Sequence, residues 1–95
     1  MNKSAIIMRS VHTKISYIIG ILDPDVAYYT NLAEFGEAHL RNETPDIKVV
    51  CVQTEGNRWS MLSVQFPGSF TRFDYEFYKS APFDMTELLV SNTED

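Results

Sequence analysis

Residues that carry metal, nucleophile or phosphate chemistry are scarce in this chain. Among its 95 residues there is one cysteine, Cys51, there are two histidines, His12 and His39, and the four glycines are isolated from one another. A single cysteine excludes an intramolecular disulfide and a cysteine-rich zinc site, and isolated glycines form no phosphate-binding loop. We interpret His39 as a partly buried, hydrogen-bonded helix residue and His12 as a solvent-facing strand residue. The sequence therefore predicts no catalytic residue, no metal and no cofactor.

Long apolar runs are absent near the start of the chain. The apolar residues 5–8 end at Arg9, far short of a signal-peptide core or a membrane-spanning helix. A protein with one cysteine also suits a reducing compartment. We therefore expect a cytoplasmic protein that is not exported and has no membrane contact.

Basic residues are outnumbered, with 8 lysines and arginines against 13 aspartates and glutamates and a net charge of -5. Residues 1–73 contain equal numbers of acids and bases, so the whole surplus lies in residues 74–95, where Lys79 is the one base. A chain with this balance lacks the basic surface that binds nucleic acid, and we predict no direct nucleic-acid contact. The asymmetry instead favours an acidic end that is directed at a basic surface.

Length and composition predict a single α+β domain over residues 1–95, with residues 91–95 as a flexible tail. The expected fold has about four mostly antiparallel strands, one long amphipathic helix on one face and a short C-terminal helix. This class follows from the alternation and helical periodicity of the segments described next.

The first half of the chain predicts one strand and one helix. Residues 11–22 alternate apolar and polar side chains and are rich in β-branched residues, which favours a strand. Apolar spacings of three and four leave a helix open for residues 5–22. Asp23 and Pro24 are typical of a helix start, with Asp23 as the side-chain cap and Pro24 at the first position. An amphipathic pattern then predicts a helix to about residue 40.

Residues 47–66 predict a β-hairpin around a two-residue loop at positions 56–57, where glycine and asparagine tolerate positive φ. In that register Cys51 faces the core, and its thiol is buried and unreactive. The opposite face is half apolar and includes Trp59 and Met61.

Residues 70–78 predict a last strand, in which alternate residues share a face. One face carries three rings and is expected to be buried: Phe73, Tyr75 and Phe77. The other face is expected to meet water: Arg72, Asp74, Glu76 and Tyr78. After this strand, residues 83–90 predict a short helix with Asp84 near its positive end.

These features lead to a hypothesis of a small acidic, non-enzymatic protein-binding module. We expect an inhibitor or antagonist that docks on a basic, nucleic-acid-binding surface of a partner such as a nuclease. Anti-restriction, anti-CRISPR, immunity and antitoxin proteins of phages and mobile elements share this size and charge. The expected contact consists of four acids and two aromatic anchors: Asp74, Glu76, Asp84, Glu87, Tyr78 and Trp59.

A self-associating accessory or structural subunit is the alternative. Its basis is the half-apolar face with Trp59 and Met61, which a short chain has few elements to cover, and a homodimer would cover it. In the competing interpretation, residues 1–8 and the last short helix cover that face internally. An enzyme whose site forms between subunits is the third and least favoured hypothesis.

Overall fold

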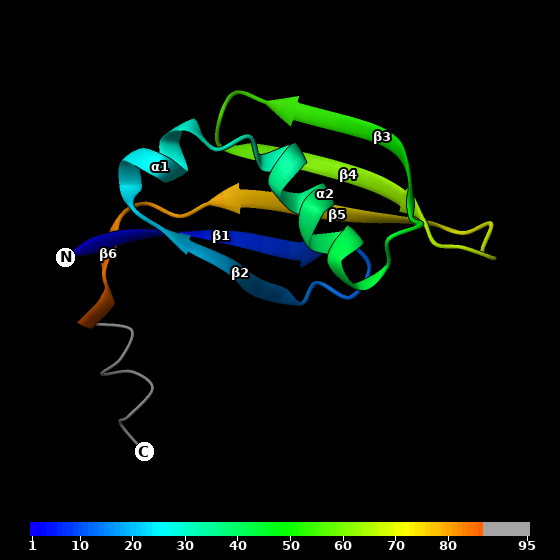
Figure 1. Ribbon diagram of the computed structural model, residues 1–95, viewed down its shortest axis with the longest axis horizontal. Helices are drawn as coiled ribbons and strands as arrows, with labels where there is room; N and C mark the ends of the chain where they lie inside the picture. The colour runs from blue at the N-terminus through cyan, green and yellow to red at the C-terminus, as the bar shows by residue number, and fades with distance from the viewer. Residues whose placement is uncertain (87–95) are drawn as a thin grey trace, which may run out of the picture.

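The computed structural model describes residues 1–86, which form one antiparallel sheet and two helices (Figure 1). The strands are β1 (Asn2–Ser10), β2 (Ser16–Leu22), β3 (Lys48–Glu55), β4 (Trp59–Gln65), β5 (Arg72–Lys79) and β6 (Phe83–Asp84); the helices are α1 (Pro24–Tyr29) and α2 (Leu32–Glu43). Five strands follow the order β2-β1-β5-β4-β3, and β6 pairs with β1. The expectation of about four strands and one long helix is therefore wrong.

The strand that the sequence interpretation missed, β1, is an interior strand of the sheet, next to the outer strand β2. It pairs with β2 along one side, and with β5 and then β6 along the other. Ser4, Ala5 and Ile6 are buried because strands flank them on both sides and α1 packs against β1. Since residues 2–10 are built into the sheet, they do not cover its second face.

The strand prediction for residues 11–22 is confirmed only for β2. Residues 11–14 instead form the turn between β1 and β2, in which Lys14 has a positive φ of 60°. A β-bulge interrupts the pairing, because Ile6 pairs with Gly20 and Ile7 with Ile18, which leaves Ile19 without a partner. The alternation of side chains therefore changes phase at Ile19.

Phe83 and Asp84 form β6 where the start of a helix was predicted. Met85 and Thr86, the last described residues, are helical, so the predicted helix begins two residues later than expected. The predicted helix from residue 87 onward, and the predicted tail at residues 91–95, lie outside the described residues. β6 is short because only Asn2 and Lys3 of β1 extend far enough to pair with it.

Two local interactions divide the predicted long helix. The Thr30 hydroxyl donates to the Val26 carbonyl at 2.8 Å, and the extended backbone of Thr30 ends α1. The Asn31 side chain then accepts from the Glu34 amide at 3.1 Å and caps the start of α2. Asn31 and Glu34 have the spacing of a capping box, a signal that the sequence interpretation did not use.

Neither helix of residues 1–86 is long and apolar enough to cross a membrane.

The start of α1 differs from the prediction in one respect. Pro24 is at the beginning of the helix as expected, but the Asp23 side chain makes no capping hydrogen bond. It forms an ion pair with Lys3 at 2.5 Å instead. The contact links the entry of α1 to β1.

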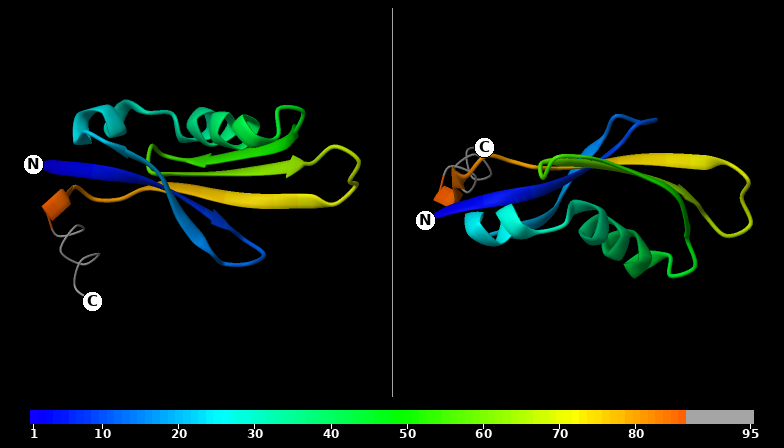
Figure 2. Two further views of the ribbon diagram at one scale, coloured as in Figure 1. Left: turned by 60° about the horizontal axis from the view of Figure 1, so that its bottom comes forward. Right: turned by 90° about the horizontal axis from the view of Figure 1, so that it is seen from above.

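Both helices lie on the same face of the sheet (Figure 2). The core between the two layers consists of side chains from all parts of the chain: Ile6, Leu32, Ile47, Leu62, Val64 and Phe77. Phe77 is fully buried, as predicted from the alternation in residues 70–78. The second face of the sheet is therefore the side to which Asp74, Glu76 and Tyr78 project.

The predicted hairpin exists, but its register is shifted by one residue between Cys51 and Glu55, and a β-bulge at Val50 restores the predicted pairing at Lys48 and Val49. Glu55 pairs with Trp59, so the loop has three residues, 56–58, and not two. Val52 consequently pairs with Leu62 on the helix side, and Cys51 pairs with Ser63 on the second face. The prediction of a buried Cys51 is wrong, since its side chain is exposed.

Candidate protein-binding face

The face of the sheet opposite the helices, here called the open face, is covered by no element of residues 1–86. Strand pairing arranges its side chains in rows that cross the sheet, because directly paired residues point to the same side. The first row contains one residue from each of five strands: Glu55, Trp59, Tyr78, Ile7 and Ile18. Four of these five are large apolar or aromatic residues.

The second row of the open face is mixed in character. It contains Gln53, Met61, Glu76, Arg9 and Ser16. Glu76 of β5 lies between Met61 of β4 and Arg9 of β1, so opposite charges face each other across neighbouring strands. A band of charge therefore lies beside the apolar row.

The third row contains Cys51, Ser63 and Asp74. The carboxylate of Asp74 accepts two hydrogen bonds. The buried Ser63 hydroxyl donates to Asp74 Oδ1 at 2.6 Å, and Arg72 Nε donates to the same oxygen at 3.2 Å. The Ser63 hydrogen bond lowers the pKa of Asp74 most, burial opposes this, and Arg72 lowers it further. Asp74 is thus a charged group already satisfied within the sheet.

The structure places four of the six predicted contact residues on the open face. Trp59 and Tyr78 are direct cross-strand partners, and Glu76 and Asp74 follow Tyr78 along the same side of β5. Asp84 lies apart on β6, where it accepts from the Thr86 amide at 2.9 Å and from its hydroxyl at 2.7 Å. These two hydrogen bonds lower the pKa of Asp84. Glu87 lies outside the described residues.

A hollow of about 360 Å³ on the helix side brings the two histidines together. His39 of α2 is half-buried and His12 of the β1–β2 turn is exposed, with its ring 5.9 Å from the ring of Phe73. The hollow also contains Glu43 and Tyr75, and burial raises the pKa of Tyr75. Within residues 1–86 no group of three or more His, Cys, Asp or Glu side chains could hold a metal ion.

A larger hollow of about 550 Å³ lies beneath α1 at the other end of the sheet. Lys79 Nζ donates there to the Tyr28 carbonyl at 3.1 Å and to Asn57 Oδ1 at 3.0 Å, and the Asn57 amide donates to the same carbonyl. Burial lowers the pKa of Lys79. These bonds tie α1, the β3–β4 loop and β5 together, which is a structural role for Lys79.

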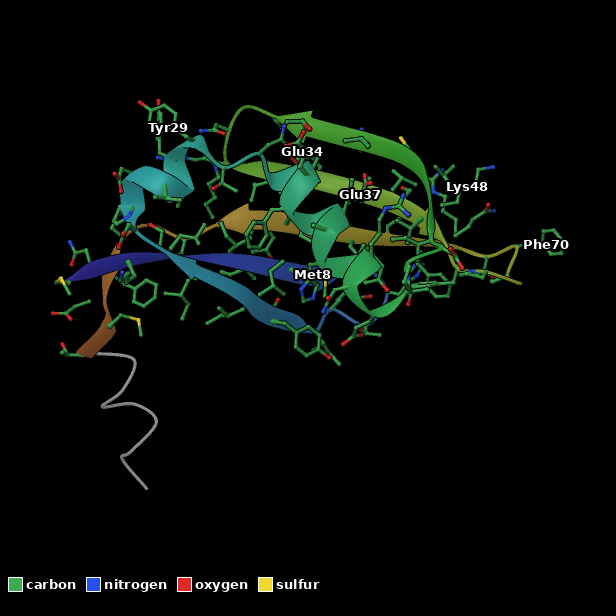
Figure 3. All side chains as sticks on the ribbon, viewed as in Figure 1. Met8, Tyr29, Glu34, Glu37, Lys48 and Phe70 are labelled. Atoms are coloured by element: carbon green, nitrogen blue, oxygen red, sulfur yellow. The ribbon has the colours of Figure 1, made fainter. Side chains whose placement is uncertain are left out.

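Sequence reasoning missed two groups of surface residues. Ile7, Arg9 and Ile18 belong to the open face, but their place was hidden because β1 was not recognised. Phe70 is 98% exposed at the tip of the β4–β5 loop (Figure 3), although it was assigned to the last strand. Proline and glycine at positions 67–68 predict a turn over residues 66–69, but this signal does not determine whether the next strand begins at Phe70 or, as observed, at Arg72.

The Phe70 loop is held in one conformation by its own hydrogen bonds. The Ser69 amide donates to the Phe66 carbonyl at 3.1 Å, and the Ser69 hydroxyl accepts from the Thr71 amide at 3.1 Å. Gly68 provides the positive φ of 78° that the turn requires. The ring therefore lies on a loop that has hydrogen bonds of its own.

No protein-family model matches the chain, and neither a curated protein nor a solved structure is significantly similar to it.

Proposed function

We propose that the protein is a non-enzymatic, cytoplasmic protein-binding module that docks on a basic surface of a partner protein through its open face. The single observation that carries the proposal is the row of Trp59, Tyr78, Ile7 and Ile18 on a sheet face that no described element covers. Aromatic residues near the centre of a flat surface are the usual anchors of protein interfaces.

The acidic surplus of residues 74–95 supports a basic partner, because this segment contains six acids and one base. On the open face itself, three acids, Glu55, Asp74 and Glu76, are matched in number by three bases, Arg9, Lys48 and Arg72. Lys48 lies on this face because it pairs with Gln65, which in turn pairs with Arg72. A partner with basic side chains beside an apolar centre complements this distribution of charge.

An inhibitor or antagonist is the form of binding that we favour. A small acidic domain bound over a nucleic-acid-binding surface blocks that surface without any covalent chemistry. The proposal requires one contact surface and no catalytic group.

The test compares anchors on the open face, which are half-buried, with a more exposed aromatic on the helix side. Tyr29 projects from α1 and is 82% exposed, so Tyr29→Ala is the control for Trp59→Ala and Tyr78→Ala (Figure 3). A partner captured from the native host is purified and its affinity for each variant is measured by calorimetry. We expect Trp59→Ala and Tyr78→Ala each to weaken binding by at least about tenfold, and Tyr29→Ala to have no effect.

Salt dependence tests the basic character of the partner in the same assay. Affinity is expected to fall when salt is raised to several hundred millimolar, because the acidic groups that surround the anchors are exposed to screening. Binding that is equally strong in all three variants, or that is unaffected by salt, would contradict the proposal.

A further inference from the structure

We propose that two copies of the chain associate through their β2 strands, antiparallel about a two-fold axis, so that the two sheets become one continuous sheet. β2 is an outer strand of the sheet and pairs with β1 only (Figure 1). The backbone groups on its outer side have no strand partner among residues 1–86. An outer strand of this kind is a template for another strand.

The composition of β2 favours pairing with another apolar strand. Residues 16–22 contain no charged side chain, and four large apolar residues on or beside the strand are exposed. Their exposed fractions are 50% for Ile15, 55% for Tyr17, 51% for Ile18 and 40% for Ile21. Outer strands of monomeric proteins commonly carry lysine or proline, which discourage such pairing. β2 carries neither.

Charge identifies β2 as the edge, and the register in which β2 can pair with itself, described next, favours a second copy as the occupant. Each copy has a net charge of -5, so association of two copies is least opposed at an edge that carries no acid. The opposite outer strand, β3, also exposes Val50 and Val52, but it carries Lys48 and Glu55. β2 is thus the neutral edge of an acidic molecule.

The β-bulge at Ile19 selects the register. Because the alternation changes phase there, Ser16, Ile18 and Ile21 point to the open face, and Tyr17, Gly20 and Leu22 to the helix side. A two-fold axis between Ile18 and Ile19 pairs residue 16 with 21 and residue 17 with 20, each with a residue of the same face. At the axis itself Ile18 lies opposite Ile19, the bulged residue, which packs toward the core.

A dimer formed in this way enlarges the surface described above. A two-fold axis perpendicular to the sheet leaves both open faces on the same side. The two apolar rows, each ending at Ile18, then meet at the axis and form one strip across both copies. The inference does not depend on the proposed function, because the contact is made by the strand edge and not by the open face.

The test introduces a lysine on each outer strand. Tyr17→Lys places a charge on β2 and Val52→Lys places one on β3; the two residues are 55% and 50% exposed, and both point to the helix side. Dissociation constants are measured by analytical ultracentrifugation over a concentration series. We expect the natural sequence to form a dimer. The dissociation constant of the dimer is expected to be unchanged in Val52→Lys and to rise at least about a hundredfold in Tyr17→Lys.

Hydrogen exchange of the natural sequence provides a second test that needs no variant. The Ser10 amide donates to the Ile15 carbonyl, so Ile15 and Tyr17 point their backbone groups toward β1, whereas Ser16 and Ile18 point theirs outward. We expect exchange at Ser16 and Ile18 to slow on the order of tenfold at concentrations that favour the dimer.

A natural sequence that is monomeric throughout the series would overturn the inference. So would equal loss of association in the two variants, or exchange at Ser16 and Ile18 that does not depend on concentration. Tyr17 is not on the open face, so Tyr17→Lys can abolish the dimer without changing the residues that are proposed to bind a partner, Trp59 and Tyr78. Failure of the dimer and failure of the proposed partner binding are therefore distinguishable.

Discussion

Gly36 of α2 lies directly against the ring of Phe77 in β5. A Cβ atom at position 36 would come within 2.6 Å of two ring carbons of Phe77, closer than non-bonded carbon atoms approach. The glycine therefore lets the helix pack closely on the central part of the sheet. Phe77 fills the space, which is why its ring has no exposed surface.

Gly36→Ala is expected to destabilise the protein by about 1–3 kcal/mol in urea unfolding, because the overpacked helix must move away from Phe77. Helix propensity acts in the opposite direction, since alanine is favoured over glycine by about 1 kcal/mol in a helix interior. Asn42→Ala at an exposed position of α2 is the control, and it is expected to leave stability unchanged or slightly higher. A more stable Gly36→Ala protein would contradict the close contact.

The Ser63–Asp74 hydrogen bond predicts a specific dependence of stability on pH. The pKa of Asp74 is lower in the folded state than its ordinary value of 3.8, so its charged form stabilises the fold. This stabilisation is complete above the ordinary pKa and is lost as the pH falls through the folded pKa.

Ser63→Ala removes the main cause of the lowered pKa and is expected to cost about 1 kcal/mol near neutral pH. The variant and the natural sequence should become more similar in stability as the pH falls below the ordinary pKa of 3.8 and Asp74 is protonated. Denaturant unfolding at several pH values measures the difference, and carbon NMR titration of the Asp74 carboxyl measures the pKa directly. A difference that stays constant down to the lowest pH would show that Ser63 acts through packing alone.

Phe70 and Phe73 are separated by two residues, but truncation to alanine is expected to reduce the stability of the protein only at Phe73. Phe73 is half-buried, and its ring is 5.4 Å from that of Phe66 in an edge-to-face arrangement, whereas Phe70 is 98% exposed. Phe73→Ala is expected to reduce stability by about 2–4 kcal/mol, and Phe70→Ala to change it by less than about 0.5 kcal/mol. Thermal unfolding of the two variants distinguishes them. Equal losses would mean that the Phe70 loop packs on the sheet.

Part of this fold could be predicted because the local signals were strong. The alternation in residues 70–78 placed Phe77 in the core and Tyr78 on the other face, as β5 shows. Pro24 correctly predicted the start of α1. The division of the helix was also encoded locally, in the Asn31 cap and its hydrogen bond to the Glu34 amide. It was missed because the apolar arc continues through both helices.

Other parts depend on contacts that are distant in sequence. Residues 2–10 become an interior strand because β2 and β5 bond to them from both sides, and nothing within the segment determines that position. The open face was therefore predicted without Ile7, Arg9 and Ile18. On β5, by contrast, Asp74 and Glu76 were correctly placed on one side with Tyr78, since alternation within a strand is a local property.

The face of the sheet to which Cys51 points depends on whether the β3–β4 loop has two or three residues. A two-residue loop would direct its side chain to the core, but the three-residue loop at positions 56–58 pairs it with Ser63 on the open face. Glycine and asparagine are compatible with either loop, so the local sequence did not decide between them. A slip of one residue moves every side chain of a strand to the other face.

The exposed position of Cys51 predicts a thiol that is modified without unfolding. β3 is an outer strand, and the Cys51 side chain is accessible to solvent, so an aromatic disulfide reagent is expected to react in the native protein. The native rate should be within about tenfold of the rate in denaturant, because access does not require the strand to open. Cys51→Ser, which removes the one thiol of the chain, is the blank for the assay. A native rate lower by several orders of magnitude would mean that Cys51 is buried, as the two-residue loop had predicted, and would place the β3–β4 register in error.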